Sequence, residues 1–260
     1  MSVESAVIVL WTLLGTAVGS FLNVAADRLP EAASLLRPPS HCPACGRRLT
    51  PLEMIPLLSY VILRGRCRTC GARIGLRTFL VEGTCGLLFG LMALQARSPT
   101  GLRWPALLFH SVYAAALLLI TVTDIEQGLI FDRVTFPALA LAAFHALLQG
   151  WPQMGLRLAG GALGAGVIAL IILLVPGGMG WGDAKLAAFI GLMAGLPGLL
   201  FALFIGFVSG GLIGAALLIG GRARRGDTLP LGPFLAFGGV VTLLYEEALI
   251  RVFETLSAAL

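Results

Sequence analysis

Two aspartates are the residues in this chain most capable of chemistry, because each stands where a long uncharged run meets a charged segment. Asp124 ends the run Trp104–Thr123, and Asp183 follows the run Leu158–Gly182. A carboxylate at bilayer depth costs about 2.5–3.5 kcal/mol on insertion scales, so such acids usually serve a function. Two carboxyl groups held close together share a proton, and the pair can activate water for peptide hydrolysis without a metal.

The residues around the second aspartate fit this interpretation. Gly180 and Gly182 remove side-chain bulk, so an extended substrate backbone can lie against the chain there. Lys185 can hold one carboxylate ionised or extend its charge to the surface. The alternative is that both acids are simply solvated or paired with basic neighbours. Glu82, in another apolar run, is expected to make a buried hydrogen bond to another helix.

Four of the five cysteines form a second candidate site. They make two CxxC pairs separated by 21 residues, namely Cys42 with Cys45 and Cys67 with Cys70. Each pair can grip one ion from a tight turn, and two pairs complete a tetrahedral sulfur shell around zinc. Two disulfides are the alternative, which a reducing compartment disfavours. A zinc ion with four thiolates has no open position, so we expect it to be structural.

The composition places these residues in a membrane protein. Of 260 residues, 58% are hydrophobic and 12% are charged, whereas a soluble domain carries about 25% charged residues. Uncharged or nearly uncharged runs long enough to cross a bilayer recur along the chain. They are 6–26, 78–96, 104–123, 134–156, 158–182, 186–221 and 228–245. The longest run is too long for one crossing, and Gly195–Gly198 is where it is expected to fold into a hairpin.

The positive charges predict the orientation of these eight spans. Segments 27–77, 124–133, 183–185 and 222–227 fall on one side and hold 14 of the 18 Lys and Arg residues. Positively charged loops stay in the cytoplasm, so both termini should lie outside. The remaining four basic residues, Arg157 among them, are assigned to the opposite side. The net charge of +5 reports this topology, and nucleic-acid binding is not expected.

The predicted fold is an all-α polytopic membrane protein of about eight transmembrane helices with a small cytoplasmic loop domain that binds zinc through four cysteines. Residues 1–26 form the first transmembrane helix, which is expected to remain as an anchor because no basic segment precedes it. Residues 27–77 form the loop domain. Residues 78–260 form a seven-helix domain that holds both aspartates. No HExxH or GxSxG motif is present.

Ordered motifs along nearly the whole chain resemble the bacterial prepilin peptidases, also called type IV leader peptidases. The matching stretches are GSFLNV at 19–24, IPLLSY at 55–60, RGRC at 64–67, GWGDAK at 180–185 and LPLGPF at 229–234, together with the two CxxC pairs. Asp124 matches the first catalytic aspartate of the family. Asp183 lies in the GxGD motif that carries the second.

The resemblance implies a membrane aspartic endopeptidase that removes the short basic leader of type IV prepilins and of type II secretion pseudopilins. It implies a multi-pass protein of the bacterial inner membrane whose active site faces the cytoplasm. Many members also methylate the new amino terminus with S-adenosylmethionine. The donor-binding residues, the particular substrate and the oligomeric state are left open.

Two departures from the family pattern and two rival functions remain at this stage. Phe131 replaces a proline after the first aspartate, and Met54 replaces an asparagine in the loop that the family links to methylation. An ion- or proton-coupled transporter would use Glu82 and the two aspartates as a relay. A zinc-stabilised structural subunit of a secretion apparatus would have no chemistry.

Overall fold

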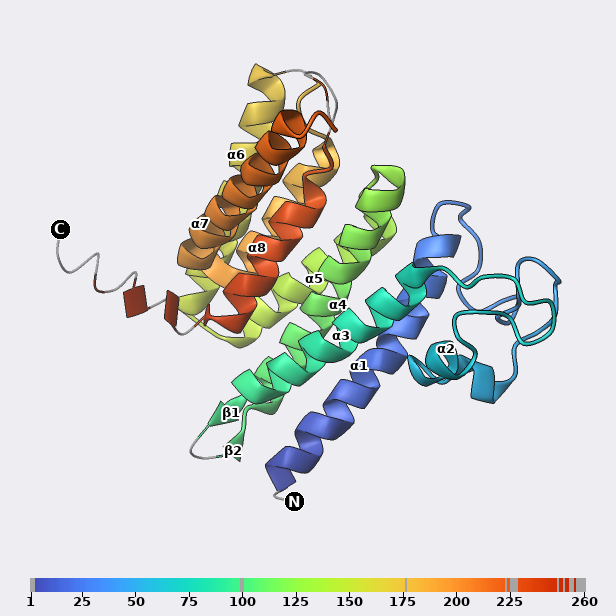
Figure 1. The fold of residues 1–260 in the computed structure, drawn as a ribbon. Helices are drawn as coiled ribbons and strands as arrows, with labels where there is room; N and C mark the ends of the chain where they lie inside the picture. The colour runs from blue at the N-terminus through green and yellow to red at the C-terminus, as the bar shows by residue number, and fades with distance from the viewer. Residues whose placement is uncertain are drawn as a thin grey trace. The chain divides into compact units, whose positions relative to one another are not determined.

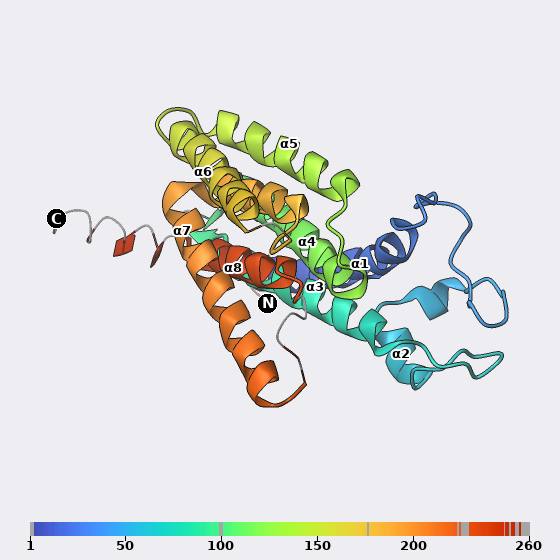
Figure 2. The ribbon, with the colours of Figure 1, turned by 90° about the horizontal axis from the view of Figure 1, so that it is seen from above.

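The chain divides into two compact units, Met1–Leu119 and Ile120–Leu260, so the division falls within the residues of helix α4, Trp104–Gln127. Figures 1 and 2 label the helices of each unit. The computed structural model describes residues 3–98, 101–175, 177–222, 224, 229–246, 248–249, 251–252 and 255. Apart from one short hairpin, the described elements are helices. Part of the predicted segment 222–227, residues 223 and 225–227, lies outside the described residues, as does residue 228, where the last span is expected to begin.

In the first unit, α1 (Val3–Arg28) packs along α3 (Leu76–Gln95), and small residues bring the two helices close (Figure 1). A Cβ added at Gly19 of α1 would lie 2.7 Å from the Cα atom of Glu82 on α3. A Cβ added at Gly86 of α3 would lie 2.6 Å from the Thr16 side chain. Glycine at these positions is therefore required by the close approach of the helices, which is the usual packing device inside a bilayer.

The segment between α1 and α3 is irregular apart from the 3-10 helix η1 (Pro51–Met54) and the short helix α2 (Leu58–Ile62). Glu82, only 4% exposed, anchors it to α3. Its Oε2 atom accepts a hydrogen bond of 2.7 Å from the backbone N–H of Leu57, the N-cap residue of α2. Glu82 therefore makes a hydrogen bond as expected, but the bond is partly buried and its partner is this loop residue instead of another helix.

A two-stranded antiparallel hairpin, β1 (Arg97–Ser98) and β2 (Gly101–Leu102), follows α3 at the end away from α2 (Figure 1). Helix α4 begins directly after it. Its first turns belong to the same unit as α1, because the indole N–H of Trp11 donates a hydrogen bond of 2.8 Å to the Ser111 hydroxyl. The last turn of α4 belongs to the second unit.

The second unit contains α5 (Asp132–Leu148), α6 (Gln153–Leu174), α7 (Trp181–Ile219) and α8 (Gly232–Leu244). Helix α6 packs closely against the first part of α7 through glycines. A Cβ at Gly160 would lie 2.6 Å from the carbonyl oxygen of Gly191. This contact between glycines holds α6 close to the part of α7 that carries Asp183.

Helix α7 is interrupted near its middle, as the sequence predicts. Gly195 has φ +72°, outside the helical region, and Pro197 follows. Gly164 of α6 lies against both Ala187 and Leu199, which precede and follow the break. Those two residues would be about 18 Å apart along a straight helix, so α7 consists of two segments.

Five helices are long and apolar enough to cross a membrane, namely α1, α3, α4, α6 and α7. Helices α5 and α8 are apolar but shorter. With α7 counted as two segments, the described residues hold eight apolar helical segments. The predicted all-α membrane fold with about eight helices is therefore confirmed.

Two details of the sequence prediction are wrong. Helix α6 ends at Leu174, so Asp183 begins the next helix rather than following a span that reaches Gly182. The glycine-rich residues 177–180 precede α7, and glycine has little preference for helix. Arg157, predicted in a connecting loop, is 6% exposed within α6, because partners from other helices surround its guanidinium group.

Candidate active site and metal centre

Asp124 lies in the last turn of α4 and is 6% exposed. Its Oδ2 atom accepts a hydrogen bond of 3.0 Å from the backbone N–H of Gly232, the first residue of α8. A Cβ added at Gly232 would lie 2.6 Å from that oxygen. Only a glycine lets the start of α8 come this close, so Gly232 fixes the orientation of the Asp124 carboxylate.

Asp183 lies in the first turn of α7 and is 9% exposed. Its Oδ2 atom accepts a hydrogen bond of 3.0 Å from the backbone N–H of Gly180, the N-cap residue. The Asp183 N–H in turn donates to the Gly180 carbonyl at 3.0 Å. The partial positive charge of a helix N-terminus favours a carboxylate at this position. The GxGD sequence therefore builds a helix cap that orients its own aspartate.

The second unit brings the two aspartates together. The two carboxyl groups are near enough for the charge of Asp183 to act on Asp124. Each carboxylate uses Oδ2 to accept an N–H from a glycine at a helix N-terminus. Neither Oδ1 atom has a hydrogen-bond partner among the described residues. The arrangement is a pair of oriented, largely buried carboxylates with an oxygen each for a water molecule or a substrate carbonyl.

Lys185 and Gly182, which flank Asp183 in the sequence, contact residues other than Asp124 and Asp183. Lys185 forms an ion pair with Asp132 at 2.5 Å and lies 5.2 Å from the centre of the Phe136 ring. A Cβ added at Gly182 would lie 2.9 Å from the Ile130 side chain. The Lys185 contacts join the start of α7 to the first turns of α5, and the Gly182 contact joins it to the segment between α4 and α5, so both support the position of Asp183.

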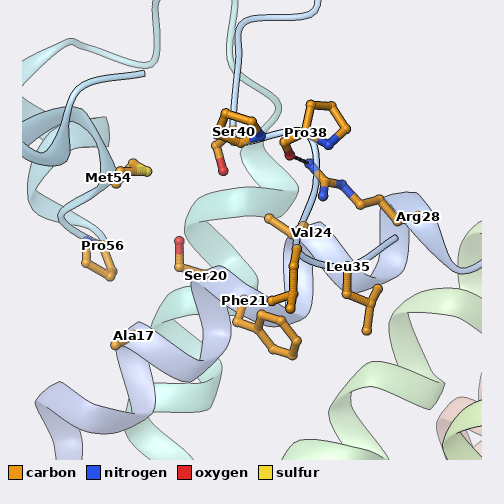
Figure 3. A pocket seen from close by; sticks show the side chains of 12 residues that line it. Ala17, Ser20, Phe21, Val24, Arg28, Leu35, Pro38, Ser40, Met54 and Pro56 are labelled. Carbon is orange, nitrogen blue, oxygen red and sulfur yellow. Dashed lines mark hydrogen bonds between the residues drawn. The ribbon is translucent and has the colours of Figure 1, made fainter. Parts of the chain in front are cut away.

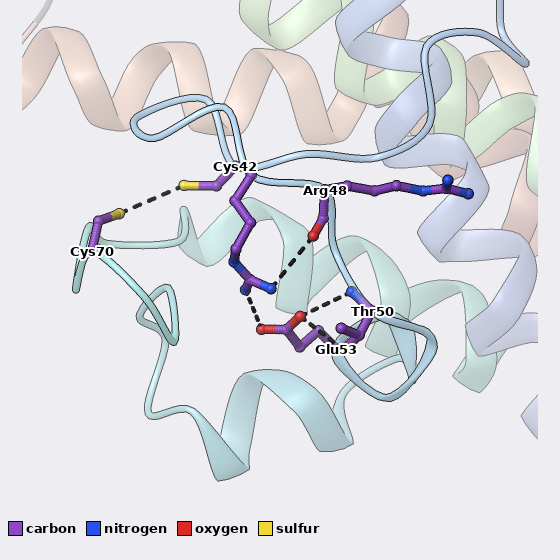
Figure 4. Close-up of polar contacts among 6 residues, drawn as sticks. Cys42, Arg48, Thr50, Glu53 and Cys70 are labelled. Atoms are coloured by element: carbon purple, nitrogen blue, oxygen red, sulfur yellow. Dashed lines mark hydrogen bonds and ion pairs between the residues drawn. The ribbon is translucent and has the colours of Figure 1, made fainter.

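The four paired cysteines converge in the first unit. Their sulfur atoms all lie within 4.8 Å of one another, and those of Cys42 and Cys70 are 3.8 Å apart (Figure 4). A tetrahedral zinc site with bonds of about 2.3 Å to sulfur has sulfurs about 3.8 Å apart. The backbone N–H groups of Cys70 and Thr69 donate to the Cys67 sulfur and lower the pKa of that thiol to about 6. The donor set and its spacing fit a tetrahedral metal ion.

An ion pair and a capping box stabilise the chain beside this cluster (Figure 4). Glu53 accepts a hydrogen bond of 2.5 Å from Arg47 through one carboxylate oxygen, and through the other it accepts hydrogen bonds from the N–H and hydroxyl groups of Thr50. The Arg47 and Thr50 donors lower the pKa of Glu53 to about 2. Glu53 thus ties the turn after the first CxxC pair to the start of η1.

Family models match most of the chain. Residues 13–96 match the Bacterial Peptidase A24 N-terminal domain, and residues 111–215 match the Type IV leader peptidase family. The chain belongs to the type IV leader peptidase family. It is a multi-pass membrane protein, as that family is, and both aspartates lie within the second matched region.

Curated relatives of similar length belong to the same family. A "Prepilin leader peptidase/N-methyltransferase" of Bacillus subtilis is 35% identical, and the match covers 93% of this chain and 95% of the relative. A protein with the same description from Pseudomonas putida is 33% identical, with 92% and 91% covered. One from Burkholderia pseudomallei is 35% identical, with 90% and 84% covered. No solved structure is significantly similar to the chain, and nothing in these comparisons favours a transporter.

Three residues that help to position Asp124 and Asp183 could not be predicted from the sequence. Gly232 belongs to a stretch that resembles the family, but nothing in its spacing indicates contact with Asp124. Ile130 and Asp132 follow Asp124 closely, and their contacts with Gly182 and Lys185 exist only once α7 is packed. Phe131, which stands where the family pattern has a proline, is the N-cap residue of α5. Its side chain makes no capping hydrogen bond.

Proposed function

We propose that this chain is a prepilin leader peptidase in which Asp124 and Asp183 perform the hydrolysis. The observation that carries the proposal is the pairing of two oriented, buried carboxylates at helix ends. Because like charges at short range do not both ionise easily, the pair holds one proton. Gly180, Gly182 and Lys185 act in support by shaping and positioning the start of α7.

The chemistry follows from one proton shared by the pair. The ionised aspartate removes a proton from a water molecule as its oxygen bonds to the scissile carbonyl carbon. The protonated aspartate hydrogen-bonds to the carbonyl oxygen and stabilises the charge that develops there. When the carbon–nitrogen bond breaks, the leaving amine takes up a proton from the pair, and the shared proton is restored for the next cycle.

The proposed substrates are type IV prepilins and pseudopilins, whose apolar helix would lie in the lipid bilayer beside the enzyme. We place the protein in the bacterial inner membrane with the loop domain, residues 27–77, and the acids facing the cytoplasm, since that side carries most of the basic residues. Residues 1–26 would anchor the chain, and residues 78–260 would form the peptidase domain.

The four clustered cysteines would bind structural zinc. Four thiolates fill the tetrahedral shell, so the ion holds the loop together and leaves no position for a substrate. The relatives' description as N-methyltransferases further supports S-adenosylmethionine as a methyl donor for this chain. When bound, the donor supplies a methyl group whose bond to sulfur breaks as its bond to the neutral amine nitrogen forms, and that nitrogen then loses a proton to water.

One assay tests both activities. The purified full chain is mixed with a prepilin and S-adenosylmethionine, and the mass of the product's amino-terminal peptide is measured. The unmodified chain should give a cleaved and methylated product. Asp124→Asn and Asp183→Asn should give no cleavage while remaining folded in the membrane fraction. Glu126→Gln, an exposed neighbour of Asp124, is the matched control and should retain cleavage. Full activity in either aspartate variant would refute the assignment.

A further inference from the structure

Helix α2 presents an apolar face to the outside of the first unit. Leu58, Val61 and Ile62 are spaced three and four positions apart, so they share one side of the helix. Their exposed fractions are 51%, 61% and 68%. The other side of the helix packs inward, because the ring centre of Tyr60 lies 5.2 Å from that of Phe79 on α3. Contiguous apolar surface of this kind marks a site of contact with a protein or a membrane.

An ion pair marks the level at which α1 and α3 leave the bilayer. Asp27 follows the uncharged run of α1, and Arg77 precedes the nearly uncharged run of α3. Their side chains pair at 2.7 Å. Because charged side chains at the ends of spans lie at the polar surface of the membrane, this pair marks that surface on both helices. Residues further into either helix lie below it by an amount that the helical rise gives.

On α3, Glu82 attaches the start of α2 below this level. Glu82 lies five residues beyond Arg77, which is about 7.5 Å deeper at 1.5 Å per residue. Its carboxylate accepts the backbone N–H of Leu57 at 2.7 Å. Leu57 is the N-cap residue of α2, so no carbonyl of that helix accepts its N–H. Irregular backbone at bilayer depth needs a partner within the protein because lipid supplies none, and the buried carboxylate provides it.

On α1, the same segment lies beside residues that are also below the ion pair. Met54 and Pro56 face Ser20 across a pocket (Figure 3). Ser20 lies seven residues before Asp27, which is about 10 Å deeper along the helix. Two helices thus independently place residues 54–58 at the depth of lipid acyl chains. The apolar face of α2 follows directly from that segment.

Positive charge follows the apolar face along the chain. Residues 54–81 contain five arginines and no acidic residue. Arg64 and Arg66 come just after α2, are exposed, and form no ion pair with any residue that the structure describes. An apolar face followed by unpaired arginines matches a leaflet of anionic lipid, which offers acyl chains to the first and phosphates to the second. The basic leader of a prepilin would be repelled by the same charges.

We propose that residues 54–62 form a re-entrant segment that inserts into the lipid leaflet beside the loop domain, with Arg64 and Arg66 binding anionic headgroups. The apolar face of α2 contacts the acyl chains. The arginines remain at the headgroups because they follow the inserted helix. The segment therefore attaches the four-cysteine loop to the membrane surface. This role is separate from peptide cleavage and from methyl transfer.

Photocrosslinking of the full chain in lipid nanodiscs, with a prepilin present, tests the insertion. The photoreactive amino acid p-benzoylphenylalanine replaces Ile62 on the apolar face. In the matched control it replaces Thr69, which is exposed between Cys67 and Cys70. The mass of each adduct identifies the molecule in contact. Position 62 should give phospholipid adducts at several times the yield of position 69. Leu58, on the same face, is the second probe position if the Ile62 variant fails to fold.

The headgroup contact is tested in nanodiscs that hold equal amounts of phosphatidylglycerol and phosphatidylcholine. Each arginine near a surface strengthens its attraction to anionic lipid by about fivefold. At position 62, phosphatidylglycerol adducts should therefore outnumber phosphatidylcholine adducts. Arg64→Gln combined with Arg66→Gln should lower that ratio several-fold. Arg222→Gln combined with Arg251→Gln removes two exposed arginines of the second unit and should leave the ratio unchanged.

Each alternative occupant gives a distinct result. An adduct of position 62 with the prepilin, or with a second copy of this chain, would refute a lipid partner. Equal lipid yields at positions 62 and 69 would mean that the apolar face lies outside the leaflet. An unchanged lipid ratio in the Arg64 and Arg66 variant would refute the headgroup contact. None of these measurements depends on cleavage, so their failure is distinguishable from failure of the proposed peptidase function.

Discussion

The guanidinium group of Arg157 donates a hydrogen bond to the carbonyl oxygen of Met193. In an uninterrupted helix that oxygen would accept the N–H of the residue four positions later, which is Pro197 and has none. The same guanidinium pairs with Glu246 at 3.0 Å and donates to the Gln149 side chain at 2.7 Å. The buried Arg157 guanidinium therefore supplies a donor to the carbonyl that the break in α7 leaves without one. Glu246 in turn neutralises the charge of Arg157.

The first prediction concerns this network. Arg157→Met keeps the length of the side chain but leaves the Met193 carbonyl without a donor and Glu246 without its cation. A buried acceptor left unsatisfied costs about 1–3 kcal/mol. We expect a lower midpoint of thermal unfolding in detergent, together with reduced cleavage, because the break joins the segment that carries Asp183 to the segment that follows. Arg251→Met, at an exposed position, should change neither.

A second prediction follows from the contact between Gly232 and Asp124. In Gly232→Ala the added Cβ would meet the Asp124 carboxylate, so one of them must move. A displacement of about 1 Å at a reacting group can cost about 100-fold in rate. We expect prepilin cleavage to fall by about that factor. Gly211→Ala, where an added Cβ meets nothing within 4 Å, should retain cleavage. Equal activity in the two variants would argue against a role for Gly232.

A third prediction concerns the ion pair between Lys185 and Asp132, which is partly exposed. Exposed pairs contribute about 0.2–1 kcal/mol to stability. Lys185→Met and Asp132→Asn should each lower the free energy of unfolding slightly, and the double variant should cost less than the sum of the two. A double-mutant cycle measures this coupling. A much larger loss of cleavage in Lys185→Met alone than in Asp132→Asn would mean that Lys185 acts directly on the catalytic pair.

A fourth prediction concerns metal content. Substituting serine for Cys67 should remove bound zinc, because one of the four sulfur ligands is lost. Cys85→Ser should keep the metal, because Cys85 is buried in α3 and does not belong to the cluster. Mass-spectrometric metal analysis of the purified chains checks both expectations. Retention of a full equivalent of zinc in the Cys67 variant would refute the four-cysteine site.

The fifth prediction uses the pKa of Glu53, which Arg47 and Thr50 lower to about 2. Because the pKa is lower in the folded loop than in the unfolded chain, the contact stabilises the loop above about pH 4.5 and is lost as the pH falls toward 2. In Arg47→Met the titration midpoint of the Glu53 carboxyl carbon, followed by NMR, should rise toward its ordinary value. In Arg48→Met it should stay low. An unchanged midpoint in the first variant would mean that Arg47 is not the cause.

The sequence by itself determined the class of the protein, its apolar helices, the hairpin in α7 and the four-cysteine cluster. These follow from local information, since composition and run length define spans, Gly195 and Pro197 cannot continue a helix, and the CxxC spacing brings each pair of sulfurs onto one turn. The same local rules placed Asp124 and Asp183 at helix ends.

Only the tertiary structure decided which groups hold these residues in place. Gly232 contacts Asp124 from 108 positions away, and Arg157 gathers partners from as far along the chain as Glu246. Lys185 pairs with Asp132 instead of Asp124 or Asp183, and Glu82 accepts a hydrogen bond from a loop residue instead of a neighbouring span. Such contacts depend on how distant helices approach each other, and that approach is set by many glycine contacts acting together, which no single stretch of sequence encodes.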